Sequence, residues 1–178
     1  MRVIAGDHRG RPLKTAAGTT TRPTADRVRE AIFDVLGSLL DLDGTAVVDL
    51  FAGSGALGIE ALSRGAASAV FVESAPAALR AIEGNLATLG LGGRARVVRE
   101  DALRFLERPH RFDLALCDPP YEFSAWDTLL ARLHATLAVL ETRQPVEAPG
   151  GWETVKHKRY GGTLVTVVRS LGAQKGTR

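Results

Sequence analysis

The feature that most constrains the fold is the regular alternation of strand-like and helix-like patterns after residue 44. Helical periodicity and short apolar runs take turns along the chain. We predict strands at 45–51, 68–73, 95–100, 112–117 and 136–141. The predicted helices between them span 56–64, 75–90, 101–107 and 124–135. Such alternation favours an α/β fold, with a mostly parallel sheet covered by helices on both faces.

The two ends of the chain depart from this alternation. Residues 152–160 and 163–170 read as strands joined by Gly161-Gly162, which predicts an antiparallel C-terminal hairpin and a seven-stranded sheet. Residues 1–16 read as two short strands around "DHRG", a small basic hairpin, and 17–23 as a Gly/Thr-rich link. Thr24 is the predicted N-cap of a helix over 25–40. We therefore predict an N-terminal hairpin extension at 1–22 and a main domain at 23–178.

Composition excludes several classes of protein. No apolar run approaches the roughly 18 residues of a membrane span, and the N-terminus carries charges where a secretory signal needs apolar residues. The single cysteine, Cys117, excludes an internal disulfide framework, and we expect it in the core. The four histidines are widely spaced, so we expect no metal site. We predict a cytoplasmic protein, monomeric and free of membrane contact.

Positive charge is concentrated at the start of the chain. The formal net charge is +3, yet residues 1–29 alone carry +5 and the remainder carries −2. A smaller basic run, "KHKR", lies at 156–159. A basic patch on a near-neutral body suits a polyanionic partner, because binding to phosphates releases counterions. A solvated surface that keeps the protein soluble explains the same composition equally well.

A glycine-rich loop follows the first predicted strand. "DLFAGSGALG" places Gly53, Gly55 and Gly58 in G-x-G-x-x-G spacing between a strand and a helix. The glycines permit a tight turn and close approach of a ligand, and the helix N-terminus adds partial positive charge. The loop predicts a nucleotide-like ligand at the carboxyl ends of the strands.

Acidic residues at the strand ends narrow the choice of ligand. Glu73 closes the next strand, where a carboxylate can accept hydrogen bonds from ribose hydroxyls, and NAD satisfies this as well as S-adenosylmethionine does. Asp49, Asp101 and Asp118 add carboxylates at the same predicted edge. A pyrophosphate would meet this charge unfavourably, whereas a sulfonium and an ammonium would be attracted. The pattern favours S-adenosylmethionine.

The fourth strand ends in "DPPY", residues 118–121, at the same edge as the glycine loop. Asp118 can accept a hydrogen bond from an amino group, while Pro119 and Pro120 fix the backbone and stop the strand. Tyr121 offers a flat face on which a base can stack. Together they are suited to hold a planar amine with its nitrogen directed at a methyl donor.

These segments resemble a known family. "DPPY" and "DLFAGSGALGIEAL" are similar to the amino-methyltransferases that depend on S-adenosylmethionine. "MRVIAGDHRGRPLKT" and "TRPTADRVREAIFDVL" narrow the resemblance to the RsmD-type family, which methylates the guanine N2 amine of small-subunit (16S) ribosomal RNA. The resemblance covers Met1 to about Tyr121 and thins beyond it. It implies a Rossmann-like class I methyltransferase fold and 16S ribosomal RNA or the small ribosomal subunit as partner.

The resemblance also implies roles for individual residues. Gly53 to Gly55 would hold the methionine portion of the cofactor, Glu73 the ribose, and Asp101 with Ala102 the adenine. The full predicted cofactor site comprises Asp49, Phe51, Ala52, Gly53, Ser54, Gly55, Gly58, Glu73, Ser74, Asp101 and Ala102. The predicted catalytic residues are Asp118, Pro119, Pro120 and Tyr121. The predicted RNA-binding residues are Arg2, Arg9, Arg11, Lys14, Arg22 and Arg27.

Four other functions remain open on the sequence. A DNA amino-methyltransferase acting on adenine N6 or cytosine N4 shares the D-P-P-Y motif and flips its base out of the duplex. A protein glutamine methyltransferase also receives a planar amide, but the basic N-terminal hairpin would then have no clear purpose. A non-catalytic RNA-binding module would not need the intact Asp118 and glycine loop. An NAD-dependent dehydrogenase makes no use of D-P-P-Y.

Overall fold

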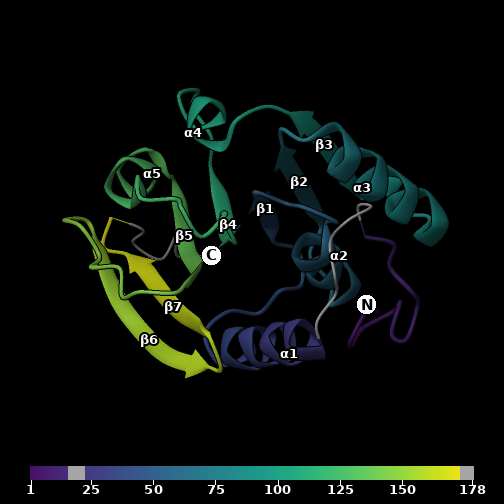
Figure 1. The fold of residues 1–178 in the computed structure, drawn as a ribbon, viewed down its shortest axis with the longest axis horizontal. Coiled ribbons are helices and arrows are strands. Elements are labelled where there is room, and N and C mark those ends of the chain that lie inside the picture. Colours follow the sequence, from purple (N-terminus) through teal and green to yellow (C-terminus); the bar gives the residue numbers. More distant parts are fainter. Residues whose placement is uncertain (16–22, 173–178) are drawn as a thin grey trace.

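The protein is built on one seven-stranded sheet, seen in the computed structural model of the chain, which describes residues 1–15 and 23–172 (Figure 1). The strand order is β3-β2-β1-β4-β5-β7-β6, parallel from β3 to β5 and antiparallel at β7 and β6. The strands are β1 (Ala46–Leu50), β2 (Ser68–Glu73), β3 (Ala95–Arg99), β4 (Phe112–Cys117), β5 (Ala135–Thr142), β6 (Trp152–Tyr160) and β7 (Thr163–Ser170). The order reverses between β1 and β4, where ligands of such sheets bind.

Helices cover both faces of this sheet. The helices α1 (Pro23–Gly37), α2 (Ala56–Ser63) and α3 (Pro76–Leu89) pack with one set of strand side chains into the larger core cluster. The helices α4 (Ala102–Phe105) and α5 (Trp126–Arg132) pack on the opposite face with the alternate side chains. A 3₁₀ turn, η1 (Gly92–Arg94), precedes β3. The predicted α/β architecture with its C-terminal hairpin is confirmed.

The element boundaries follow the sequence pattern closely. β2, β4, β6 and β7 begin and end at the predicted residues, because each is an alternating or apolar run bounded by turn residues. The connection from α5 to β5 consists of Leu133 and His134 alone, so the turn is very tight. Leu133 is buried and packs in the second core cluster, which lies between the sheet and the helices α4 and α5.

The N-terminal arm, residues 1–15, differs from the predicted hairpin of two strands. It contains a single antiparallel bridge between Arg2 and Pro12, and the chain turns at Gly6 and Gly10, both with φ of 79°. The Val3 N–H donates to the Arg11 carbonyl and the Leu13 N–H to the Met1 carbonyl on either side of this bridge, while other amides of the arm bond to α2. The predicted small hairpin is therefore confirmed, although it consists of one bridge with its flanking hydrogen bonds and not of two extended strands.

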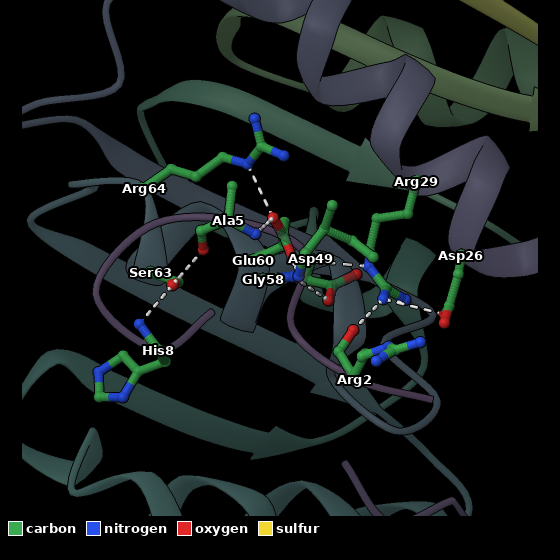
Figure 2. A network of polar contacts seen from close by, with 11 residues as sticks. Arg2, Ala5, His8, Asp26, Arg29, Asp49, Gly58, Glu60, Ser63 and Arg64 are labelled. Carbon is green, nitrogen blue, oxygen red and sulfur yellow. Dashed lines mark hydrogen bonds and ion pairs between the residues drawn. The ribbon is translucent and has the colours of Figure 1, made fainter. Parts of the chain in front are cut away.

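Glu60 and Ser63 of α2 hold the arm against the main domain (Figure 2). The buried carboxylate of Glu60 accepts hydrogen bonds from the N–H groups of Ile4 (2.8 Å) and Ala5 (3.0 Å). The Ser63 hydroxyl accepts from the His8 N–H and donates to the Ala5 carbonyl. Val3 and Leu13 are buried in the larger core cluster. The arm therefore shares the core of the main domain.

The helix α1 begins at Pro23, one residue before the predicted N-cap Thr24, which lies in its first turn. Proline is well suited to the first turn, since the N–H it lacks would have no helical partner there. The predicted link at 17–23 lies almost wholly outside the described residues, and with it the predicted boundary at residues 22 and 23.

Candidate active site

The carboxyl ends of β1, β2, β3 and β4 bring most predicted site residues to one edge of the sheet. Residues 51–55 follow β1, Glu73 ends β2, Asp101 follows β3, and the DPPY corner (residues 118–121) follows β4. The parallel registers that pair β1 with β2 and with β4 fix this neighbourhood. The sequence alone predicts this convergence because parallel strands end together.

The glycine loop is held in shape by Glu73. One carboxylate oxygen accepts from the Gly53 N–H at 2.9 Å, and the other accepts from the N–H groups of Ser74 and Ala75, each at 2.8 Å. Gly53 and Gly55 have φ values of 57° and 78°, which glycine adopts without a Cβ penalty. Glu73 therefore organises the loop in addition to lining the pocket beside it.

Asp49 and Gly58 lie beneath the loop and do not line the pocket. Asp49 is 1% exposed, and its carboxylate accepts from the Gly58 N–H at 2.8 Å. A Cβ on Gly58 would lie 2.4 Å from Cε1 of Phe71. Burial places both residues where they pack α2 against β1 and β2, and their predicted contact with the cofactor stays a prediction. Ala52 is buried as well, while Ser54 accepts a hydrogen bond from Asn85 through its carbonyl.

A pocket of about 270 Å³ opens beside the loop. Six of its lining residues were predicted: Phe51, Glu73, Ser74, Asp101, Ala102 and Pro120. Three were not: Val72, Glu100 and Phe123. Asp101 also caps α4, accepting from the N–H groups of Leu103 and Arg104. The pocket combines apolar walls with carboxylates at its rim.

Phe123 is the residue that sequence reasoning missed most clearly. The centroid of its ring lies 5.1 Å from that of Phe51 and 5.0 Å from that of Trp126, and both pairs have edge-to-face geometry. Phe51 itself has φ of 62°, a conformation that non-glycine residues seldom adopt. The only sequence signal is the position of Phe123 two residues after the D-P-P-Y motif. Phe51 and Phe123 line the pocket, and Trp126 packs behind Phe123.

Asp118 lies on the same side of the sheet as Asp49 and Glu141. Cys117 pairs with Leu140, so the next residues of β4 and β5, Asp118 and Glu141, are neighbours. Asp118 is exposed to solvent beside the pocket-lining Pro120 and does not itself line the pocket, and partial loss of hydration raises its pKa to about 6. Burial and the charges of Asp118 and Asp49 raise the pKa of Glu141, which sequence reasoning missed.

Burial raises the pKa of two further groups near the site, Asp49 and Cys117. Loss of hydration raises the pKa of Asp49 well above its usual value, although the Gly58 N–H opposes the shift. Burial likewise raises the pKa of the Cys117 thiol, and Cys117 packs in the second core cluster. The thiol therefore stays protonated and is no nucleophile, which confirms its expected place in the core.

Tyr121 is 60% exposed at the end of the DPPY corner. The guanidinium carbon of Arg143 lies 3.5 Å from the centroid of its ring, a cation–π contact. Pro119 is buried and Pro120 lines the pocket. The corner is thus fixed by its prolines and offers an accessible carboxylate and an accessible aromatic ring.

The predicted RNA-binding residues lie on the surface wherever the structure describes them. Arg2, Arg9, Arg11, Lys14 and Arg27 are all exposed. Arg11 donates to the Thr88 carbonyl of α3, and the Lys14 backbone exchanges hydrogen bonds with Asn85, which also bonds to Ser54 in the glycine loop. Arg22 lies outside the described residues. The arm therefore adjoins the glycine loop through Asn85.

Residues 1–15 and 23–172 contain neither of two further features. No helix in these ranges is long and apolar enough to cross a membrane. Within the same ranges, no group of three or more His, Cys, Asp or Glu side chains is arranged to hold a metal ion.

Comparison with known proteins identifies the family. The family model described as "Conserved hypothetical protein 95" matches residues 1–169. The chain belongs to this family. "Putative rRNA methyltransferase YlbH" of Bacillus subtilis is 44% identical over 97% of this chain and 100% of its own length. Ribosomal RNA small subunit methyltransferase D of Haemophilus influenzae is 34% identical, over 90% of this chain and 89% of the relative.

The solved structures agree with the sequence relatives. "Putative methyltransferase yhhF" from Escherichia coli superposes with a TM-score of 0.84 at 34% identity, covering 96% of this chain and 97% of that one. The predicted family and class I methyltransferase fold are therefore confirmed. The prediction of an enzyme dependent on S-adenosylmethionine is confirmed at the level of its class.

Proposed function

We propose that this protein transfers a methyl group from S-adenosylmethionine to the exocyclic N2 amine of a guanine in 16S ribosomal RNA. The observation that carries the proposal is the DPPY corner beside the glycine-loop pocket, in a chain whose relatives are named ribosomal RNA methyltransferases. The substrate is either the RNA or the assembling small subunit. We expect the protein to act as a monomer in the cytoplasm, both of which stay predictions.

The residues at the pocket fit the cofactor that this reaction needs. Glu73 and Asp101 place carboxylates at its rim, where ribose and adenine present hydroxyl and amino donors. Val72, Ala102 and Phe51 offer apolar surface for a purine ring. Gly53 and Gly55 let the backbone approach the methionine portion. When bound, S-adenosylmethionine supplies a methyl group on a positively charged sulfur.

Asp118 is the residue that we assign to the chemical step. The guanine amine is a weak nucleophile, because its lone pair is delocalised into the ring. Its nitrogen becomes cationic as the new N–C bond forms, and it must then lose one proton. The Asp118 carboxylate stabilises this charge and can accept the proton. Alignment of the reactants can contribute about 7–11 kcal/mol.

The direct test is to identify the modified nucleoside. Purified protein would be incubated with methyl-labelled cofactor and, separately, ribosomal RNA, small subunits, duplex DNA and a protein extract. We expect label in RNA or small subunits only, and N2-methylguanosine after digestion to nucleosides. Label in N6-methyladenine or N4-methylcytosine of DNA, or in a glutamine side chain, would replace this proposal with a rival.

A further inference from the structure

The outer strand β6 carries a dense basic surface that the proposed active site does not use. Lys156, His157, Lys158 and Arg159 are consecutive and all exposed, against the single acid Glu153 on the same strand. β6 is the last strand of the sheet. Within residues 1–15 and 23–172, the cations in ion pairs lie elsewhere: Arg29, Arg64, Arg104, Arg108 and Arg132.

A chain of contacts joins Arg159, near the carboxyl end of β6, to the DPPY corner. The guanidinium of Arg159 donates to the Arg143 carbonyl through both terminal nitrogens, at 3.4 and 3.3 Å. The guanidinium of Arg143 lies over the Tyr121 ring. Arg159 of β6 thus fixes the backbone of Arg143, whose guanidinium lies over the Tyr121 ring. Arg159 is therefore linked to the DPPY corner through Arg143, while the side chains of Lys156 and Lys158 lie on the other face of β6, because side chains alternate along a strand.

The position of β6 complements that of the N-terminal arm. β6 and the arm lie on opposite sides of the molecule, with the strand ends of β1 and β4 between them (Figure 1). Three strand spacings separate β4 from β6 in the sheet order, about 14 Å in total. An RNA chain that enters the site can therefore meet positive charge on both sides of its target nucleotide.

We propose that β6 and Arg143 form a second RNA-docking surface, which binds phosphates of the strand flanking the target base. This inference rests on the proposed function and goes beyond it, because the predicted RNA-binding residues lie in residues 1–27. Lysines on an exposed edge strand also prevent sheet-to-sheet association. A test should therefore replace the lysines with acidic residues. These keep a charge on the edge strand, so association stays blocked, but they repel RNA.

The test compares RNA binding by Lys156→Glu/Lys158→Glu with binding by the parent protein. We expect the Kd for small-subunit ribosomal RNA to rise at least 10-fold at moderate salt. The slope of log K against log salt should fall by about 1.4, or about 0.7 for each lost phosphate contact. Arg143→Ala should raise the Kd by a smaller factor. Cofactor affinity, measured by calorimetry, and thermal stability should stay unchanged in both variants.

The matched control is Arg96→Glu/Arg111→Glu, which changes the net charge equally. Both arginines are exposed, near the starts of β3 and β4 at the sheet edge opposite the site. We expect less than a 3-fold change in Kd. Equal losses in the two double variants, or no loss in either, would overturn the second surface. Failure of the parent protein to methylate any RNA would instead overturn the proposed function.

Discussion

At the scale of single residues, the site depends on carboxylates that differ in environment. Asp49 is buried beneath the loop, Glu73 is occupied by loop amides, and Asp118 faces the open site. Asp118 combines solvent exposure with a pKa raised to about 6, so its protonation can change near physiological pH. The sequence places these acids at the ends of the strands, but their different roles become visible only from how deeply each is buried in the structure.

The pH dependence of methyl transfer should report Asp118. Because its carboxyl has a pKa of about 6, the ionised form that accepts the proton accumulates as pH rises through that value. We expect the single-turnover rate to rise about 10-fold per pH unit below pH 6 and to level off above it. In Asp118→Asn, this dependence on pH below pH 6 should disappear, and the single-turnover rate should be much lower than in the parent protein. The same rise in rate with pH in Asp118→Asn would mean that another group titrates.

The same residue should lower stability at neutral pH. A carboxyl whose pKa is higher in the folded state than in the unfolded state binds more protons when folded. Stability therefore falls as pH rises from about 4 to about 6. Since the side chain still contacts water, we expect only about 1 kcal/mol, so Asp118→Asn should raise Tm at pH 7 by about 2–4 °C. Calorimetry at pH 4 and pH 7 checks this, and an equal gain at both values contradicts it.

Gly58 tests the packing beneath the loop. A methyl group there would lie 2.4 Å from the Phe71 ring, so we expect Gly58→Ala to cost about 1–3 kcal/mol. Gly84 in α3 has open space around its Cα, and Gly84→Ala should instead stabilise by about 0.5–1 kcal/mol. Urea unfolding of both variants gives the comparison. Equal effects would show that the close contact with Phe71 does not matter.

At the scale of elements, the strands could be predicted and the docking of the arm could not. Apolar runs determine β2 and β4 almost alone, since burial on both faces demands such residues. Glu60, by contrast, looks like an ordinary solvated helix residue in the sequence. Its partners Ile4 and Ala5 lie 56 and 55 residues away, so periodicity carries no signal of them. Glu141 and Phe123 were missed for a similar reason, because both act through spatial neighbours.

Glu60 should therefore be essential for stability. It is fully buried and pairs with Arg64 at 2.8 Å, while the buried Arg29 lies at 3.7 Å. Glu60→Ala would remove the carboxylate that two arm amides and the buried Arg29 guanidinium contact. We expect the free energy of unfolding to fall by about 3–5 kcal/mol. Urea unfolding measures this cost. Glu83→Ala, on the exposed face of α3, serves as control and should change stability by less than about 0.5 kcal/mol.

The arm itself should contribute to RNA affinity. Arg9 and Arg11 are exposed, and reversing both charges should weaken RNA binding and reduce its salt slope by about 1.4. Binding titrations at several salt concentrations measure both quantities. Cofactor affinity should not change, because neither residue lines the pocket. An unchanged salt slope would remove the arm from the RNA contact.

At the scale of the whole molecule, one sheet edge brings the glycine loop, the pocket and the DPPY corner together, as the proposed reaction requires. The strand order reverses between β1 and β4, so the glycine loop and the DPPY corner become neighbours there although 63 residues separate Gly55 from Asp118. In the reaction that we propose, this arrangement would place a methyl donor and an acceptor amine side by side. No covalent intermediate is needed, consistent with the buried and protonated Cys117.

The most direct test of this account measures methyl transfer and cofactor binding in the same variant, Asp118→Ala. The account predicts that single-turnover transfer to small-subunit RNA falls at least 100-fold, while the Kd for S-adenosylmethionine changes less than about 3-fold. Transfer at the rate of the parent protein would remove Asp118, and with it the DPPY corner, from the reaction.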